Sequence, residues 1–255
     1  MQQKNTERFS NRVEDYVKYR PGYPVQVVRF LEDQYKLVRG SLIADIGSGT
    51  GISSALFLDK GYRVAGVEPN KEMRDKSVEL LGGNPAFFAI DGTAENTTLP
   101  DNSVDAIVAG QAFHWFDREK TRQEFSRILK PGGSVALIWN ERLTDTGFEQ
   151  EYDQLIVKHG IDYVQVDHRN IDLEKISAFF HPAPVRLEIF PNEQVFGFDG
   201  LEGRLLSSSY MPDKSHPGYP AMVADLKDLY DRYQEAGKIT IHYETKVFAG
   251  SWNFA

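Results

Sequence analysis

The chain has 255 residues, 41% of them hydrophobic, and a formal net charge of -8 at pH 7. It contains no cysteine, which excludes disulfides, thiolate zinc sites and cysteine nucleophiles. The acidic balance offers no basic footprint for nucleic acid, and no apolar run approaches a secretory h-region or the ~18 residues of a membrane span, so we expect a cytoplasmic protein that binds neither nucleic acid nor membrane.

Two helices are predicted at the start of the chain. The first covers residues 6–18 and is polar, and the second covers residues 25–35, where Pro24 favours a helix start. The aromatic and proline-rich sequence YRPGYP, residues 19–24, lies between them.

Strands and helices then alternate. Apolar runs predict strands at residues 42–46, 63–68, 86–90, 104–109 and 134–140, and helical patterns fall at residues 51–60, 70–81 and 118–129. The turn Pro131-Gly132-Gly133 is expected to end the last of these helices. This alternation is typical of right-handed crossovers and a parallel sheet.

The pattern changes after Asn140. Helices are predicted over residues 147–159, 171–180, 201–209 and 221–236, with an extended segment over residues 185–196. Residues 238–249, with the sequence KITIHYETKVFA, alternate as a final strand would.

The most informative motif is the glycine turn DIGSGTG, residues 45–51, which directly follows the first predicted strand. Its glycines suit a sharp turn whose backbone amides can hold a polar ligand. Glu68 ends the next strand, where a carboxylate can bind the two hydroxyls of a ribose. The glycine spacing is GxGxG, whereas a dinucleotide fingerprint reads GxGxxG, and Asp45 would repel a pyrophosphate but suit an ammonium group. The motif therefore favours S-adenosylmethionine over NAD.

Three further segments follow in the order expected of one family. They are VAGVEPN at residues 64–70, IDGTAENTTLPDNSVDAIVAGQAFHWF at residues 90–116, and LKPGGSVALIW at residues 129–139. With DIGSGTG, this set resembles the class I S-adenosylmethionine-dependent methyltransferases (methyltransferase type 11), in particular the small-molecule group that includes ubiquinone-biosynthesis and trans-aconitate-type enzymes. The resemblance covers roughly residues 10–140.

The resemblance implies an α/β fold: a Rossmann-like, doubly wound, mostly parallel seven-stranded sheet with an antiparallel edge hairpin and helical cap insertions. We expect a single methyltransferase domain over residues 1–255. Within it, residues 1–35 would form an N-terminal helical lid, residues 36–140 the cofactor-binding core, and residues 141–236 a cap with an added strand near residues 185–195. Residues 237–255 would supply the final strand.

The resemblance also implies a set of residues around S-adenosylmethionine and its product S-adenosylhomocysteine. Asp45 is expected to hold the methionine amino group and Glu68 the ribose, while Thr93 and its neighbours border the adenine. Arg20 could pair with the methionine carboxylate or with an acidic substrate, and Met73 could equally be a core residue. The predicted cofactor-binding residues are Asp45, Gly47, Ser48, Gly49, Gly51, Glu68, Pro69, Met73, Gly92, Thr93, Ala94, Glu95, Gln111, Tyr16 and Arg20.

A small-molecule methyl acceptor is predicted from the end of the fourth strand. The Asn/Asp-Pro-Pro-aromatic motif of enzymes that methylate planar amino groups is missing there, and Ala-Phe-His-Trp stands in its place. We expect substrate or lid contacts from Tyr23, Phe113, Trp115 and Tyr210, although plain packing of the two motif aromatics is the alternative. His114 is the candidate catalytic base, or else an orienting group, because methyl transfer from a sulfonium depends mainly on proximity and desolvation.

Two other functions are kept open. The first is a non-catalytic, regulatory S-adenosylmethionine-binding protein, and the second is a nicotinamide oxidoreductase, which the glycine spacing and Asp45 disfavour. No metal is predicted, because the other histidines show no ligand spacing. The chain is expected to act as a monomer or homodimer.

Overall fold

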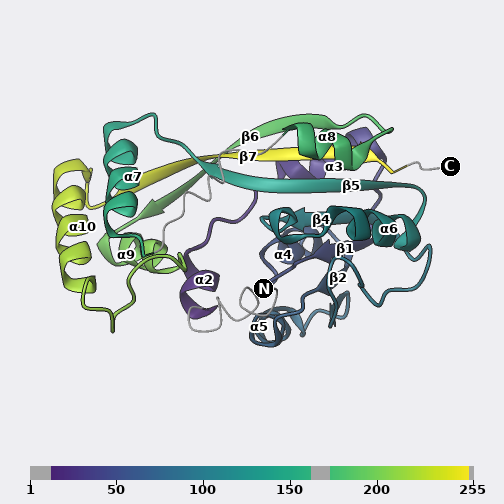
Figure 1. The fold of residues 1–255 in the computed structure, drawn as a ribbon, viewed down its shortest axis with the longest axis horizontal. Helices are drawn as coiled ribbons and strands as arrows, with labels where there is room; N and C mark the ends of the chain where they lie inside the picture. Colours follow the sequence, from purple (N-terminus) through teal and green to yellow (C-terminus); the bar gives the residue numbers. More distant parts are fainter. Residues whose placement is uncertain (1–12, 162–172, 253–255) are drawn as a thin grey trace.

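The computed structural model describes residues 13–161 and 173–252, which are built around a seven-stranded sheet (Figure 1). The strand order is β3-β2-β1-β4-β5-β7-β6. β1 to β5 run parallel, and β7 is antiparallel to both β5 and β6, so the predicted α/β sheet with an antiparallel edge pair is confirmed. The strands are β1 Leu42–Ile46, β2 Arg63–Val67, β3 Phe87–Ile90, β4 Val104–Gly110, β5 Leu129–Arg142, β6 Arg186–Phe196 and β7 Ile239–Ser251.

The helices follow the predicted order with shifted ends. The expected first helix is described from residue 13 onward, and its residues 6–12 lie outside the described part. The helices are α2 Val13–Tyr19, α3 Gln26–Tyr35, α4 Ile52–Leu58, α5 Lys71–Leu81, the 3-10 turn η2 Phe113–Trp115, α6 Arg118–Ile128, α7 Gly147–His159, α8 Leu173–Phe180, α9 Phe198–Leu206 and α10 Tyr219–Tyr233.

Two hydrophobic cores form because successive strand residues point to opposite faces of the sheet. In β5, Val135 and Leu137 join the core beneath α6 and α8, whereas Ala136 and Ile138 join the core beneath α3 and α4. The near-continuous apolar runs of the inner strands thus reflect burial on both faces.

The predicted start of the fifth strand is wrong. α6 ends at Ile128, ahead of the Pro131-Gly132-Gly133 turn, and β5 begins at Leu129 instead of residue 134. Leu129 pairs with Val104 ahead of an irregularity in the β4–β5 ladder. A residue that precedes proline is driven toward the extended region, so Lys130 cannot continue the helix.

The last two strands extend beyond the parallel strands and carry a separate group of helices. β6 and β7 pair from Arg186 opposite Ala249 to Phe196 opposite Ile239, and α9 and α10 are inserted between them. Figure 1 shows α7, α9 and α10 together at one end of the molecule, past the carboxyl ends of β1 and β4. These three helices share a hydrophobic cluster with the start of β7, and we call this unit the cap.

α8 is the exception within the region expected to form the cap. Its Phe179 and Phe180 join the sheet core, where the Phe179 ring lies 5.9 Å from that of Phe125 and the Phe180 ring 5.5 Å from that of Trp252. α8 therefore covers the sheet beside α6, because its aromatic face finds an apolar partner there.

Candidate functional site

The glycine turn at the end of β1 has the geometry that its sequence predicts. Gly47, Gly49 and Gly51 have φ angles of 68°, 56° and 90°, which favour glycine. A Cβ atom added at Gly47 would lie 2.7 Å from the Cβ of Ala112, after β4. The amides of Gly47 and Ser48 both donate to the carbonyl of Val67, at 2.9 and 3.1 Å. The turn is thus fixed between the ends of β2 and β4.

Asp45 is fully buried at the end of β1. Its Oδ2 accepts hydrogen bonds from the hydroxyls of Ser53 and Ser54, both at 2.6 Å. Its Oδ1 has no hydrogen-bond partner within residues 13–161 and 173–252. Burial raises the pKa of the Asp45 carboxyl, and the serine hydrogen bonds oppose this. A buried carboxylate oxygen without a donor is a place where a cationic ligand gains most.

Glu68 joins the glycine turn to the start of α5. Its Oε2 accepts from the amide of Gly49 at 2.9 Å, and its Oε1 accepts from the amide of Asn70 at 2.8 Å. Each oxygen keeps a second lone pair, which is what a ribose diol needs. Burial raises the pKa of Glu68, although the two amide bonds oppose this. Met73, the other residue expected beside the nucleoside, lies 3.4 Å from the Cβ position of Gly49.

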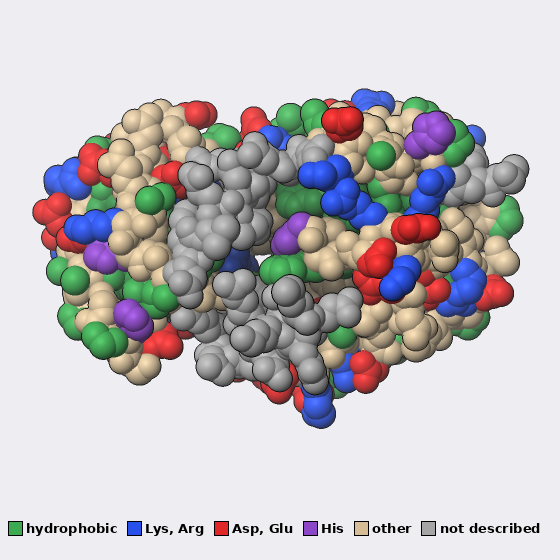
Figure 2. All heavy atoms as spheres, viewed as in Figure 1, with side chains coloured by type: hydrophobic (Ala, Val, Ile, Leu, Met, Phe, Trp, Pro, Cys, Tyr) green, Lys and Arg blue, Asp and Glu red, His purple; other side chains and the backbone are tan. Residues whose placement is uncertain are grey.

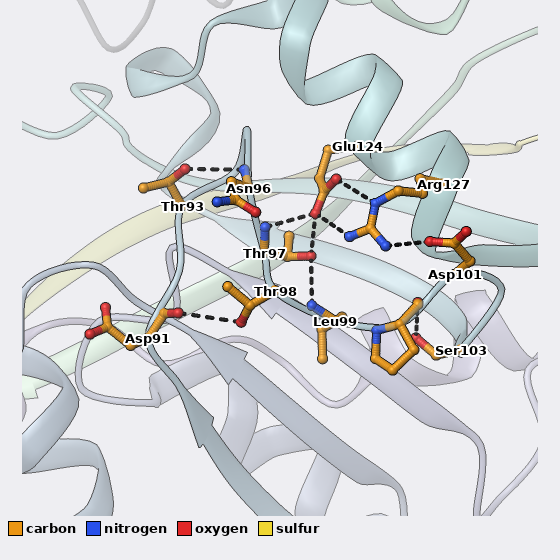
Figure 3. Close-up of polar contacts among 11 residues, drawn as sticks. Asp91, Thr93, Asn96, Thr97, Thr98, Leu99, Asp101, Ser103, Glu124 and Arg127 are labelled. Atoms are coloured by element: carbon orange, nitrogen blue, oxygen red, sulfur yellow. Dashed lines mark hydrogen bonds and ion pairs between the residues drawn. The ribbon is translucent and has the colours of Figure 1, made fainter.

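The loop after β3 is anchored on both sides. Arg74 donates to the carbonyl of Glu68 at 2.6 Å and forms an ion pair with Asp91 at 3.0 Å. A Cβ atom added at Gly92 would lie 2.8 Å from the carbonyl oxygen of Thr97, so a larger residue would move the loop. The Oγ1 of Thr93 accepts from the amide of Asn96 at 3.2 Å, within the turn drawn in Figure 3.

Figure 3 also shows what holds this loop against α6. The buried Glu124 accepts hydrogen bonds from the amide and the hydroxyl of Thr97 at 2.7 and 2.5 Å. Arg127 donates to the same carboxylate at 2.8 and 2.7 Å. Burial raises the pKa of Glu124, but the bonds from Arg127 and Thr97 outweigh it, so the pKa lies below its usual value.

Glu95 was expected to contact the cofactor, but its side chain contacts the protein backbone. Its Oε1 accepts from the amide of Asp117 at 2.9 Å, just ahead of α6. The side chain therefore holds the start of a helix, as acidic groups near helix N-termini commonly do.

The segment after β4 carries four predicted site residues, which differ in their surroundings: Gln111, Phe113, His114 and Trp115. Gln111 has a positive φ of 56°, and its side-chain amide donates to the carbonyl of Asn140 at 2.9 Å. Phe113, which was expected to line the acceptor pocket, is instead a core residue that packs 4.8 Å from Phe179 and 6.2 Å from Trp139, ring centre to ring centre. The η2 turn directs the Phe113 ring inward, as the alternative of plain packing expects, and leaves His114 and Trp115 exposed.

Residues 16–23 of the predicted N-terminal lid, which we call the lid segment, pass between the strand ends and the cap. The hydroxyl of Tyr23 lies 2.5 Å from the Cβ position of Gly110, at the end of β4. Burial, then the neighbouring Tyr16 and Asp45, raises the pKa of Tyr23 well above its usual value. Arg20 donates to the carbonyl of Ser207 at 2.9 Å and lies 5.1 Å from the ring centre of Tyr16.

Sequence reasoning missed Arg204, which is 9% exposed within α9. It donates to the hydroxyl of Tyr243 at 3.2 Å and to that of Ser207 at 3.3 Å. A signal was available, since Arg204 lies three residues after Leu201 and beside Leu205 on the apolar face of a predicted helix. Tyr210, predicted as a lid residue, lies close to Arg204 and is one of the tyrosines that raise the pKa of its guanidinium group against the effect of burial.

The arrangement suits a nucleoside with an attached amino acid. The glycine turn, Glu68 and the Thr93 loop meet at one edge of the sheet, and Asp45 and the lid segment lie beside them. Among residues 13–161 and 173–252, no three His, Asp or Glu side chains gather as a metal site needs, and no helix is long and apolar enough to cross a membrane.

Comparison with known proteins relates part of the chain to a described domain. Residues 44–137 match a family described as a methyltransferase domain. An uncharacterised methyltransferase of Mycobacterium tuberculosis is 35% identical over 152 residues, which cover 60% of this chain and 60% of that protein. The matched stretch thus spans less than two thirds of that relative.

Solved structures share the fold over nearly the whole chain. A candidate type II methyltransferase of Anaeromyxobacter dehalogenans has a TM-score of 0.69 at 21% identity, covering 91% of this chain and 98% of that one. A phosphoethanolamine N-methyltransferase of Haemonchus contortus, solved with phosphomonomethylethanolamine and S-adenosylhomocysteine, has a TM-score of 0.54 at 18% identity, covering 92% of this chain and 54% of that one.

Proposed function

Because the chain belongs to the class I S-adenosylmethionine-dependent methyltransferase family, we propose that it transfers a methyl group from S-adenosylmethionine to a small molecule. The observation that carries this proposal is the buried Oδ1 of Asp45, which has no hydrogen-bond partner in the described residues and lies beside the glycine turn. An ammonium group at that point would complete its hydrogen bonding and neutralise its charge.

The residues at the sheet edge fit this cofactor part by part. Asp45 would accept from the methionine amino group, and Glu68 would accept from the ribose hydroxyls through its remaining lone pairs. Arg20 would pair with the methionine carboxylate. Met73 and the loop carrying Thr93 and Ala94 would border the adenine. The other cofactor residues in this proposal are Tyr16, Gly47, Ser48, Gly49, Gly51, Pro69, Gly92 and Gln111.

The bound cofactor supplies a methyl group on a positively charged sulfur, which leaves as a neutral thioether. The protein's task is therefore to align the acceptor and exclude water. Tyr23 and Tyr210 lie on the sides where the lid segment and the cap would enclose an acceptor. His114 is exposed after β4, where it could take the acceptor's proton or orient the acceptor.

Two observations favour a small molecule over a macromolecule. The Asn/Asp-Pro-Pro-aromatic motif is missing after β4, and the cap lies past the carboxyl ends of β1 and β4 (Figure 1). A regulatory protein that binds the cofactor without transferring methyl groups is the second candidate. A nicotinamide oxidoreductase is disfavoured, because the carboxylate of Asp45 would face a pyrophosphate at the glycine turn.

Isotope labelling separates these candidates. The protein is incubated with S-adenosylmethionine carrying a labelled methyl group and with a broad panel of metabolites. We expect label in one class of small molecule together with S-adenosylhomocysteine. Tight cofactor binding with no labelled product from any member would support the regulatory protein instead.

His114 is tested in the same assay. Replacing His114 with alanine should lower kcat near neutral pH and leave the Kd for S-adenosylhomocysteine unchanged, because the side chain is placed toward the acceptor. An unchanged kcat would assign His114 to structure alone.

A further inference from the structure

Two arginine side chains meet between the lid segment and the cap. Both contact Ser207: Arg20 donates to its carbonyl oxygen at 2.9 Å, and Arg204 donates to its hydroxyl at 3.3 Å. Their other partners are neutral, namely the hydroxyls of Tyr243 and Ser208 and the ring of Tyr16. We call Arg20 and Arg204 the arginine pair.

The arginine pair lacks a counter-charge among residues 13–161 and 173–252. No carboxylate of the described residues forms an ion pair with either guanidinium group, although the chain carries 37 acidic residues against 29 basic ones. The Nε of Arg20 is buried without a hydrogen-bond partner in this part of the chain. Burying a charge is unfavourable by several kcal/mol unless an opposite charge accompanies it, so two adjacent unpaired guanidinium groups indicate an anionic ligand.

Arginine is suited to this task, since its guanidinium group stays charged and carries five N–H donors in a fixed plane. In Arg204, Nε and Nη1 are taken by Tyr243, Ser207 and Ser208, and Nη2 makes no hydrogen bond to residues 13–161 or 173–252. The neutral hydroxyls hold the guanidinium group in place and leave this nitrogen for a ligand. Burial, and then the nearby charge of Arg204, lowers the pKa of Arg20.

The pair lies next to the proposed cofactor site. Arg20 is three residues before Tyr23, which contacts the end of β4, and Asn140 at the end of β5 donates to the carbonyl of Gly22 at 3.0 Å. Figure 2 shows the surface hollowed between the cap and the sheet core, with Lys or Arg side chains on the cap side. Arg204 belongs to α9 of the cap, whereas Arg20 belongs to the segment whose Tyr23 contacts the end of β4.

We propose that Arg204 forms an anion subsite for an acid group, carboxylate or phosphate, of the methyl acceptor, while Arg20 pairs with the methionine carboxylate. This proposal rests on the proposed function, because it assigns the acceptor's side of the same site. Two anionic groups would then neutralise the buried Arg204 and the partly buried Arg20. The acid group would fix the acceptor from the cap side and present the rest of the molecule toward the strand ends.

Calorimetry with simple acids tests the subsite. Protein saturated with S-adenosylhomocysteine is titrated with succinate or with ethyl phosphate, and succinamide serves as the uncharged probe. We expect one of the two acids to bind and succinamide not to bind. Arg204→Met should weaken the acid at least tenfold and change the Kd for S-adenosylhomocysteine less than twofold. Arg29→Met, at an exposed position on α3, should change neither.

Three outcomes would overturn the subsite. In the first, the wild-type protein binds neither acid. In the second, Arg204→Met weakens S-adenosylhomocysteine as much as the acid, which would assign Arg204 to the cofactor's own carboxylate. In the third, Arg204→Met binds the acid as wild type does. If Arg204→Met fails to fold, Arg204→Lys keeps the charge but loses the planar group that the three hydroxyls hold in place, and it should still weaken the acid severalfold.

Failure of the proposed function has a different signature. A wild-type protein that binds no S-adenosylhomocysteine contradicts the methyltransferase proposal. Acid binding that Arg204→Met then abolishes in the unloaded protein would still support the anion subsite.

Discussion

At the scale of single residues, the proposed cofactor site depends on two carboxylates with different roles. Glu68 has both oxygens engaged by backbone amides, so it shapes the glycine turn as well as offering lone pairs to a ligand. Asp45 has one oxygen held by two serines and the other left without a donor in the described residues. This asymmetry makes Asp45 the sharper target, because its free oxygen has no structural partner to lose.

Asp45→Asn should weaken S-adenosylmethionine roughly 10- to 100-fold. The serine hydroxyls can still donate to the asparagine oxygen, but the amide nitrogen would then face the ammonium group, and a charge-assisted bond is worth about 1.5–3 kcal/mol. Isothermal titration calorimetry gives the Kd. Asp59→Asn, at an exposed position after α4, is the matched control. Equal affinity of Asp45→Asn and wild type would remove Asp45 from the site.

The raised pKa of Asp45 predicts proton release on binding. Burial favours the neutral carboxyl in the free protein, whereas an ammonium ligand favours the carboxylate, so binding lowers this pKa. Between the usual value near 3.8 and the raised one, affinity should therefore fall as the pH falls. For folding the sign is opposite, since stability from the neutral form is lost as the pH rises through that window.

Calorimetry in buffers of different ionisation enthalpy measures the released proton. Wild type should release protons at acidic pH, and Asp45→Asn should release fewer. Identical proton release by the two proteins would show that Asp45 does not titrate with binding.

At the scale of elements, the sequence predicted where strands and turns lie better than what the later helices cover. The strand–turn–helix pattern around residues 42–58 has a period and a glycine signature that depend on local geometry alone. The apolar face of α8 is equally visible in the sequence, but its partner, α6 with Trp252, is set by tertiary packing. Tertiary packing also decides the direction of the Phe113 ring, because the sequence alone allows it to face either a ligand or the core.

The contact between α6 and the loop after β3, which carries Thr93 and Thr97, can be tested through Glu124. Glu124→Gln should lower the free energy of unfolding by about 1–3 kcal/mol at pH 7, because a buried acceptor of three groups loses its charge. Denaturant unfolding measures this loss. Glu119→Gln, exposed on the first turn of the same helix, should change stability little.

The pH dependence of this effect follows from the lowered pKa of Glu124. Its contribution is fully present above the usual glutamate value of 4.5 and is lost as the pH falls through the lower value of the folded state. The gap between wild type and Glu124→Gln should therefore narrow in acid. A gap that stays constant down to the acid transition would contradict the charge-based account.

At the scale of the whole molecule, α2 connects the sheet core to the cap. A Cβ atom added at Gly203, in α9, would lie 2.1 Å from the Tyr19 ring, so α9 and α2 pack as closely as a glycine permits. Gly203→Ala should therefore displace α2 and destabilise the protein by about 1–3 kcal/mol, as overpacking typically does. Thermal unfolding measures the effect. Gly22→Ala adds a methyl group into open space and should be neutral. Equal melting temperatures for both variants would contradict the close packing.

The change of pattern after Asn140 predicted the cap as a unit. It did not predict that a buried arginine, Arg204, lies inside it. Arg204 is one cation on an apolar helix face, and only the meeting of α9 with the lid segment places it beside Arg20. Contacts between segments 187 residues apart cannot be read from local periodicity.

The most direct test of the central claim is a calorimetric titration of the wild-type protein with S-adenosylmethionine and, separately, with NAD. The geometry of Asp45, Glu68 and the glycine turn predicts saturable one-site binding of S-adenosylmethionine and no binding of NAD. Binding of NAD without binding of S-adenosylmethionine would contradict it.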